Sequence, residues 1–279
     1  MSYTEWDTGR LRMSGLEKGE GQLVVLLHGF PAYHKTWERY VEPLSSQFKV
    51  VVPDLRGYYR TDKPRGVKAY SIDELGDDIV SLVYALGYQS VRLVGHDWGG
   101  AVAWSLASRP SPVHKVVVFN CPHPEAMAEH LRKNPRQMKR SWYIFFFQIP
   151  GLPEFLIKTF PDKFVRAAFR AGRGTFSEQD LEEYRSALMI PGVIEAGLNY
   201  YRASFREALR GEVESMPISC PSLLLWGERD SALGVELTHG MERYFRGPYE
   251  CRRFPEAGHW SPNDLGEVGI SVLREFLED

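Results

Sequence analysis

The sequence has few cysteines, no excess of charge of either sign and no long apolar run. Its three cysteines are widely spaced and form no CxxC motif, which argues against a disulfide framework and fits a reducing cytosol (Cys121, Cys220 and Cys251). The 34 Lys and Arg residues nearly balance the 36 Asp and Glu residues. The resulting net charge of −2 does not indicate nucleic acid or an anionic membrane as a partner.

The longest apolar stretch, residues 142–147, is far shorter than the ~18 residues that a membrane-spanning helix needs. The first residues are polar and lack the basic and apolar regions of a signal peptide. We therefore expect a cytoplasmic protein without a transmembrane span. An apolar content of 43% and a charged content of 25% are ordinary for a globular chain and exclude a disordered or fibrous protein.

Short apolar segments rich in β-branched residues alternate with helical patterns along the chain. Segments that are apolar throughout, without alternation, are typical of strands covered on both faces in a parallel sheet. The expected strands are 23–27, 49–52, 91–94, 115–119, 222–226 and 249–254, and the clearest helices are 72–86, 102–107 and 268–277. This alternation predicts an α/β fold with a mostly parallel, doubly wound sheet.

The alternation stops after Asn120 and resumes near Pro217. The residues between them are helical, aromatic and interrupted by prolines. An insertion that follows a strand lies at the sheet edge where ligands bind, so it predicts a lid. We expect a core formed by residues 1–120 and 216–279 and a helical cap formed by residues 121–215. Extra packing helices without a role in function are the alternative.

Residues 91–101 have the pattern of a strand, a sharp turn and a helix, with Asp97 at the turn. Gly95, Gly99 and Gly100 surround it, because larger side chains would collide with the backbone of so tight a turn. This pattern is typical of a nucleophile elbow, which exposes its central side chain at the amino end of a helix. The alternative is that Asp97 only caps the helix.

A carboxylate at the elbow determines which bonds can be attacked. Asp97 is ionised at neutral pH and needs no base to become a nucleophile. Its attack on an ester would give an anhydride, whereas its attack on a saturated carbon that bears a leaving group gives an alkyl ester that water can hydrolyse. We therefore expect an epoxide or an alkyl halide as the substrate, and not a peptide or a lipid ester.

The other parts of such a site follow in the expected order of nucleophile, acid and base. Asp230 directly follows an expected strand, and His259 lies in the last loop before the final helix. His259 can take a proton from water while Asp230 orients it, and Glu228 is the alternative acid. The backbone N–H groups of Phe30 and Trp98 are expected to form an oxyanion hole.

Five motifs resemble those of the soluble epoxide hydrolases of the α/β-hydrolase fold: HGFP (28–31), DLRGY (54–58), GHDWGG (95–100), GERD (227–230) and GHW (258–260). The similarity covers essentially the whole chain. It implies an inserted cap domain and hydrolysis of a small-molecule epoxide by water, through an Asp nucleophile, with no cofactor and no metal. One departure is that Tyr59 and Arg60 stand where family members usually have Gly and a small residue.

In that family two cap tyrosines point at the epoxide oxygen. By motif position they match Tyr143 and Tyr201, with Tyr200 as the alternative to Tyr201. Epoxide opening liberates an alkoxide, and a phenol with a pKa of about 10 can donate a proton or a hydrogen bond to it. The resemblance therefore implies that Tyr143, Tyr201, Phe30 and Trp98 contact the substrate. Aromatic packing within the cap is the alternative role for both tyrosines.

The residues leave two alternative functions open. Haloalkane dehalogenases usually carry Asn where this chain has Phe30, and fluoroacetate dehalogenases carry Arg where Trp98 and Ala101 stand. Both differences favour an epoxide. A haloalkane dehalogenase with the same nucleophile is the first rival, and a small-molecule binding protein with low turnover is the second.

The cap is rich in aromatic and basic residues. We expect its aromatic residues to line an apolar cleft over Asp97 (residues 142–147, Phe155, Phe160, Phe164 and Phe169). We interpret its basic residues as a solvated helix face and not as an anion or membrane patch (Arg132, Lys133, Arg136, Lys139 and Arg140). No nucleic acid is expected as a partner, and a homodimer is left open.

Overall fold

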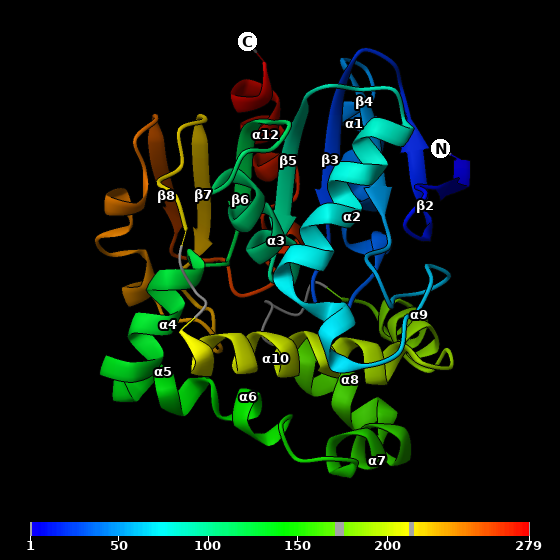
Figure 1. The fold of residues 1–279 in the computed structure, drawn as a ribbon, viewed down its shortest axis with the longest axis vertical. Helices are drawn as coiled ribbons and strands as arrows, with labels where there is room; N and C mark the ends of the chain where they lie inside the picture. The colour runs from blue at the N-terminus through cyan, green and yellow to red at the C-terminus, as the bar shows by residue number, and fades with distance from the viewer. Residues whose placement is uncertain (1, 171–175, 212–214, 279) are drawn as a thin grey trace.

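The computed structural model describes residues 2–170, 176–211 and 215–278 and is built around one eight-stranded sheet (Figure 1). The strands are β1 (Ser2–Asp7), β2 (Arg12–Lys18), β3 (Gln22–Leu27), β4 (Phe48–Pro53), β5 (Val91–His96), β6 (Val113–Phe119), β7 (Ser222–Gly227) and β8 (Tyr249–Phe254). Their order across the sheet is β1-β2-β4-β3-β5-β6-β7-β8.

The helices alternate with these strands and then form a continuous helical stretch between β6 and β7. The α-helices are α1 (Glu38–Leu44), α2 (Ile72–Ala85), α3 (Trp98–Ala107), α4 (Pro124–Lys133), α5 (Pro135–Arg140), α6 (Trp142–Phe146), α7 (Leu152–Thr159), α8 (Pro161–Phe169), α9 (Glu178–Leu188), α10 (Val193–Arg210), α11 (Ser261–Leu265) and α12 (Glu267–Leu277). The short 3-10 helices are η1 (His34–Trp37), η2 (Val67–Tyr70), η3 (Val235–Thr238) and η4 (Met241–Tyr244).

The expected mostly parallel α/β sheet is confirmed. The pairs from β4 through β3, β5, β6 and β7 to β8 are all parallel. β1 and β2 pair antiparallel with each other, and β2 pairs antiparallel with β4. The sequence did not predict β1 and β2, because these segments lack the uniformly apolar run that marked the central strands.

Helices cover both faces of the sheet. Val25 packs on one face with Ile79 of α2 and Val102 of α3. Its neighbour in the strand, Val24, packs on the other face with residues of α1 and α12, among them Val41 and Leu273. Successive side chains of a strand point to opposite faces, so a strand that is apolar throughout can contribute to two separate cores. This is why the sequence showed no alternation.

The helices α4 to α10 lie across the carboxyl ends of the parallel strands, with α10 as the longest of them in the described part of the chain (Figure 1). α10 follows Gly192 and stops at Gly211, which both have left-handed backbone with φ of 89° and 72°. The helical content and position of this insertion agree with the sequence, although residues 171–175 and 212–214 of the expected cap lie outside the described residues. The division into core and cap stays a prediction.

Within the described residues, no helix combines the length and the apolar character that crossing a membrane would require.

Candidate active site

Asp97 stands alone between β5 and α3 in a conformation that non-glycine residues rarely adopt, with φ of 52° and ψ of −120°. The glycines around it are needed for close backbone approach. A Cβ on Gly95 would lie 2.3 Å from the Gly99 carbonyl oxygen, and a Cβ on Gly99 would lie 2.2 Å from that of Leu27. The Asp97 side chain makes no capping hydrogen bond to α3. It is therefore turned away from the helix, which argues against a simple N-cap.

The Asp97 carboxylate is held by the segment that follows β3. The Phe30 backbone N–H donates to Asp97 Oδ1 at 2.8 Å, and the N–H of the next residue, Trp98, also favours the charged carboxylate. A Cβ on Gly29 would lie 2.3 Å from Oδ1. Burial raises the pKa of Asp97, whereas His259 and the two N–H groups act in the opposite direction, and the net result is a raised pKa.

His259 lies between two carboxylates. Its Nδ1 donates to Asp230 Oδ2 at 2.8 Å, and its Nε2 lies 3.8 Å from Asp97 Oδ2. Burial disfavours the charged imidazole, but Asp230 and Asp97 together outweigh this and raise the pKa of His259 to about 9. The structure thus brings together Asp97, Asp230 and His259 from three distant parts of the sequence.

Asp230 is fully hydrogen-bonded. Besides the bond from His259, its Oδ1 accepts from the backbone N–H groups of Ala232 and Leu233, both at 2.8 Å, and its Oδ2 accepts from Asn120 Nδ2 at 2.9 Å. These four donors satisfy the hydrogen-bonding capacity of the buried carboxylate and fix its position. The sequence interpretation missed Asn120. Its only signal was a polar side chain directly after a buried strand, at the edge where ligands bind.

Glu228, the alternative acid, is exposed and lies 3.7 Å from Arg253. It therefore points away from His259, and the geometry selects Asp230.

Two buried histidines connect the site to the backbone. His96 Nε2 donates to the carbonyl oxygen of His259 at 2.8 Å. His28 Nδ1 donates to the Gly29 carbonyl oxygen, and its Nε2 accepts from the Leu55 N–H, each at 3.0 Å. Burial lowers the pKa of both histidines, and that of His28 falls to about 4. They are neutral supports for the loops that carry His259 and Phe30.

Tyr143 on α6 and Tyr201 on α10 approach the elbow from the helical side. The ring of Tyr201 lies 5.0 Å from that of Trp98 and 5.9 Å from that of Tyr143, measured between centroids. Burial raises the pKa of both phenols, and in each case the negative charge of Asp97 is the next largest cause. Both hydroxyls therefore stay protonated.

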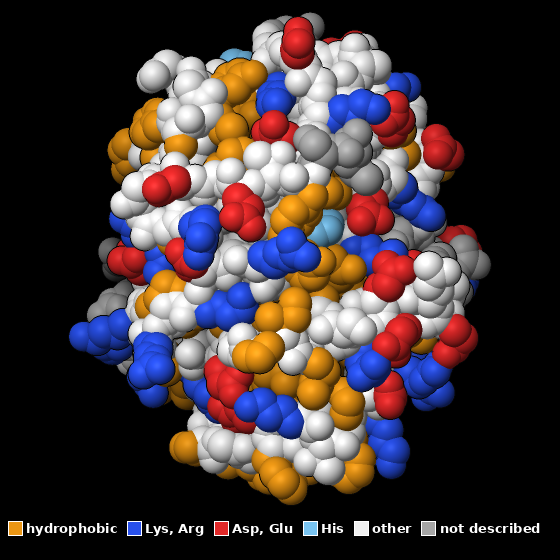
Figure 2. Space-filling view, turned by 90° about the vertical axis from the view of Figure 1, so that its right-hand side faces the viewer, with side chains coloured by type: hydrophobic (Ala, Val, Ile, Leu, Met, Phe, Trp, Pro, Cys, Tyr) orange, Lys and Arg blue, Asp and Glu red, His pale blue; other side chains and the backbone are white. Residues whose placement is uncertain are grey.

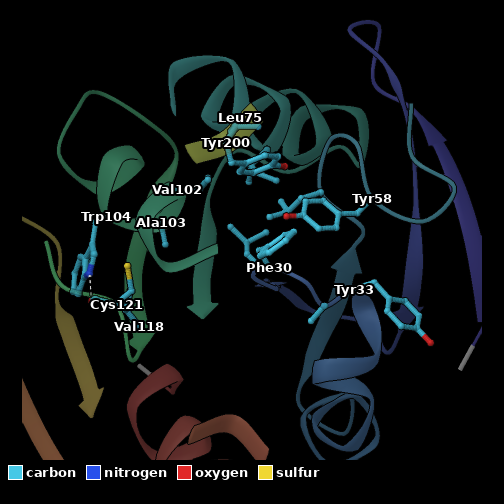
Figure 3. Packing of buried hydrophobic residues seen from close by; sticks show 14 of the residues in the cluster. Phe30, Tyr33, Tyr58, Leu75, Val102, Ala103, Trp104, Val118, Cys121 and Tyr200 are labelled. Carbon is cyan, nitrogen blue, oxygen red and sulfur yellow. Dashed lines mark hydrogen bonds between the residues drawn. The ribbon is translucent and has the colours of Figure 1, made fainter. Parts of the chain in front are cut away.

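Tyr200 faces a different part of the molecule. Its hydroxyl donates to the carbonyl oxygen of Arg56 at 2.7 Å, and its ring lies 5.5 Å from that of Tyr58. Figure 3 shows Tyr200 and Tyr58 in the buried cluster beside Phe30. Because neighbours in a helix point about 100° apart, only one of Tyr200 and Tyr201 can face Asp97. The geometry selects Tyr201.

Aromatic rings enclose the space next to Phe30. Its ring lies 5.6 Å from that of Tyr201, 5.8 Å from that of Phe164 and 6.0 Å from that of Phe147. Phe169 is also buried and stacks on Trp260, the neighbour of His259, at 4.3 Å. These contacts provide an apolar wall beside the carboxylate.

The prediction that the whole aromatic run lines this cleft is wrong. Trp142 and Phe155 are each 63% exposed, and Phe160 and Phe145 are 48% and 42% exposed. α6 and α7 lie beyond α10, on its side away from the sheet (Figure 1). No residue of α6 is fully buried, and α7 buries only Pro153 and Ile157. The prediction rested on the aromatic content of this segment, and composition does not show which face of a helix a side chain lies on.

The departure at Tyr59 and Arg60 reshapes a turn near the N-terminal strands. Tyr59 has a φ of 44° and stacks on Tyr33 at 5.1 Å. The Arg60 guanidinium lies over the ring of Tyr3 at 5.2 Å. A position with left-handed backbone favours Gly, which explains why Gly is usual there. Here the aromatic contacts offset the strain.

No group of three or more His, Cys, Asp or Glu side chains within residues 2–170, 176–211 and 215–278 is arranged to hold a metal ion.

The chain is similar to known proteins of the α/β hydrolase fold. A profile of the alpha/beta hydrolase fold matches residues 22–262. The chain is 34% identical to the human protein named epoxide hydrolase 4, over 97% of this chain and 78% of that protein. It is also 34% identical to the AB hydrolase superfamily protein YfhM of Bacillus subtilis, over 96% of this chain and 94% of that one.

Solved structures show the same similarity. The epoxide hydrolase of Bacillus megaterium, determined with an inhibitor, superposes with a TM-score of 0.85 at 31% identity, and each chain is covered completely. An epoxide hydrolase found in metagenomes from hot environments superposes with a TM-score of 0.88 at 27% identity, over 100% of this chain and 99% of that chain.

Proposed function

Because the chain belongs to the epoxide hydrolases of the α/β hydrolase fold, we propose that it converts an apolar epoxide to a vicinal diol through a covalent ester on Asp97. The observation that carries this proposal is the orientation of the Asp97 carboxylate. Its Oδ1 is held by the Phe30 N–H at 2.8 Å, while its Oδ2 faces His259 Nε2 across 3.8 Å. One oxygen is thus fixed, and the other faces the space where a substrate carbon would lie.

In the first step, Asp97 Oδ2 attacks the less hindered epoxide carbon and the carbon–oxygen bond of the ring breaks. Tyr143 and Tyr201 donate hydrogen bonds to the leaving oxygen, and one of the two phenols transfers its proton to it. The raised pKa values of both phenols keep them protonated until that oxygen develops charge. The product of this step is a hydroxyalkyl ester of Asp97.

In the second step, His259 takes a proton from water, and the resulting hydroxide attacks the Asp97 carbonyl carbon. The developing oxyanion is stabilised by the N–H groups of Phe30 and Trp98. The bond between this carbon and the alkyl oxygen then breaks, and the alkyl oxygen takes the proton from His259, so that the diol leaves. The proton of the new Asp97 carboxyl group returns to the tyrosine that lost one in the first step. Esterification removes the charge of Asp97, which is one of the causes that raise the pKa of His259. His259 therefore becomes a better base once the ester has formed.

The helices of residues 121–215 act in this proposal as a cap that contributes both tyrosines and separates the ester from bulk water. The apolar wall formed by Phe147, Phe164 and Tyr201 next to Phe30 favours an apolar substrate. A cytoplasmic location and a homodimer stay predictions.

The decisive experiment is intact-protein mass spectrometry of the His259→Gln variant with a panel of epoxides. We expect an adduct with the mass of one epoxide, located on the peptide that contains Asp97, because the ester forms but is not hydrolysed. Asp97→Asn should give no adduct, and Glu228→Gln should turn over like the wild type. Absence of an adduct from the folded His259 variant would rule out the covalent route.

The same panel separates the rival functions. Simple haloalkanes are expected to release no halide, because the leaving group would meet the phenol hydroxyls of Tyr143 and Tyr201, and Phe30 stands where haloalkane dehalogenases usually carry Asn. A binding protein with low turnover would instead show a rise in melting temperature with an epoxide and no diol.

A further inference from the structure

Six large apolar side chains of the insertion are exposed to solvent, and we call them the outer aromatic face. Their exposed fractions range from 41% to 63% (Trp142, Phe145, Ile149, Leu152, Phe155 and Phe160). They belong to α6, α7 and the loops beside them. In Figure 1, α6 and α7 lie beyond α10, on its side away from the sheet, and α5 lies at one side of them. Figure 2 shows apolar side chains at the lower end of the molecule, with Lys and Arg side chains and some Asp and Glu side chains around them.

The same part of the chain is strongly basic, although the protein as a whole is not. Residues 131–170 contain nine Lys and Arg residues and only two acidic residues. One of the two, Glu154, is buried in an ion pair with Arg202 at 2.6 Å. Arg136 and Lys139 on α5 are exposed and have no ion-pair partner within the described part of the chain. Four of the nine cations are ion-paired with acidic residues outside this range (Lys133–Glu129, Arg140–Glu236, Lys158–Glu195 and Arg166–Glu178). The local excess of positive charge is therefore carried by the other five, Arg132, Arg136, Lys139, Lys163 and Arg170.

One cation lies directly beside an exposed ring, and others are close in the sequence. The Lys163 ammonium lies over the ring of Phe160 at 5.1 Å from its centroid. Lys139 and Arg140 end α5, two residues before Trp142 starts α6. Exposed Trp, Phe, Leu and Ile side chains with Lys and Arg at their border are typical of surfaces that lie in the interface of an anionic bilayer.

We propose that the outer aromatic face binds the surface of an anionic phospholipid bilayer. Trp142, Leu152 and Phe155 enter the boundary between headgroups and acyl chains, and the cations of α5 contact the lipid phosphates. The interpretation of the basic residues as a merely solvated face is replaced by this one, because the sequence did not show that the neighbouring aromatic residues are exposed.

Two other occupants fit the observations less well. A second copy of the chain, docked symmetrically on this face, would bring two basic surfaces together, which is unfavourable. A nucleic acid would contact the cations but would leave the aliphatic side chains of Ile149 and Leu152 without an apolar partner. A bilayer satisfies both the charge and the apolar surface.

This surface has a consequence for catalysis that rests on the proposed function. Trp142 and Tyr143 are neighbours on the five-residue helix α6. One side chain belongs to the outer aromatic face, and the other approaches Asp97. An apolar epoxide partitions into bilayers, so docking by this face would bring the catalytic cleft to the place where the substrate is concentrated.

The test is binding of the full-length protein to vesicles, measured by co-sedimentation. Vesicles of phosphatidylcholine with roughly 30% phosphatidylserine should bind the wild type, vesicles of phosphatidylcholine alone should bind it much more weakly, and about 0.5 M salt should release it. The Leu152→Ser/Phe155→Ser variant should bind more than about tenfold more weakly, because two exposed apolar side chains are lost. Arg136→Glu/Lys139→Glu should weaken binding at least as much.

Matched controls change the same chemistry elsewhere. Val268→Ser on α12, 53% exposed, removes an exposed apolar side chain at a distance from the insertion. Arg12→Glu on β2, whose side chain is 66% exposed, reverses a charge near the other end of the molecule. Both should bind vesicles like the wild type.

Three results would overturn the proposal. They are failure of the wild type to bind anionic vesicles at low salt, unchanged binding by the Leu152/Phe155 variant, and a concentration-dependent dimer in sedimentation that this variant abolishes. Epoxide turnover without vesicles should be unchanged in all four variants. A wild type that binds vesicles but hydrolyses no epoxide would refute the proposed function and leave the bilayer proposal intact.

Discussion

The side-chain amide of Asn120 donates at 2.9 Å to the same oxygen of Asp230 that accepts from His259. Asn120 also accepts from the Gly227 N–H at 2.8 Å, so it joins the end of β6 to the loop after β7. Its φ of 38° is tolerated better by Asn than by most other residues. A single side chain thus fixes both the position of the acid and the oxygen that it presents.

Replacing Asn120 by Ala should lower kcat by about tenfold, since Asp230 loses a charge-assisted hydrogen bond of about 1.5–3 kcal/mol. The loss should fall on ester hydrolysis, in which His259 acts, and not on alkylation. Rapid-quench measurement of the alkyl-enzyme separates the two steps. Asn120→Gly separates loss of the amide from backbone strain, because it also lacks the amide but adopts a positive φ freely. If the Gly variant were as active as the wild type, the amide would not be needed.

The stability of the protein should depend on pH through His259. The pKa of His259 is raised from 6.5 to about 9, so its protonated form stabilises the folded state. This contribution is fully present below pH 6.5 and is lost as the pH rises through about 9. We expect the melting temperature to fall over this interval. The fall should be smaller in Asp97→Asn, which removes one of the charges that raise this pKa. An equal fall in both proteins would contradict the electrostatic assignment.

Tyr200 and Tyr201 provide a matched pair of substitutions. Tyr201→Phe should slow alkylation by about tenfold or more, because the leaving oxygen loses a donor, while leaving the melting temperature nearly unchanged. Tyr200→Phe should leave alkylation unchanged and lower the free energy of unfolding by about 1 kcal/mol, because the Arg56 carbonyl oxygen loses its donor. Stopped-flow kinetics and urea denaturation measure the two effects. The reverse assignment of effects would show that Tyr200 faces the substrate.

Gly29→Ala should remove activity without unfolding the protein. The added Cβ would lie 2.3 Å from Asp97 Oδ1 and 2.4 Å from its Cβ, so the nucleophile must move. Since a displacement of about 1 Å can cost ~10²-fold in rate, we expect at least that loss. Circular dichroism and adduct formation with His259→Gln in the same chain test this. An adduct that forms at the normal rate would show that the carboxylate tolerates the shift.

The features that depend on local backbone constraints were determined by the sequence. Gly95, Gly99 and Gly100 around Asp97 specify a turn that few other residues could form, and the uniformly apolar strands specify a sheet covered on both faces. Asp97, Asp230 and His259 then occur along the chain in the order of nucleophile, acid and base. These features could be predicted because each depends on residues close together in the sequence.

Other features depend on which residues meet in space, and only the tertiary structure decided them. Tyr200 and Tyr201 are identical side chains at adjacent positions in the sequence. Only the packing of α10 decides which of them faces Asp97. Trp142 and Phe155 belong to an aromatic segment like Phe147, yet α6 and α7 turn them outward. Asn120 and Asp230 are 110 residues apart in the chain and meet only because β6 and β7 are adjacent in the sheet. A side chain's role is set by the neighbours that folding gives it, and no local pattern in the sequence specifies those neighbours.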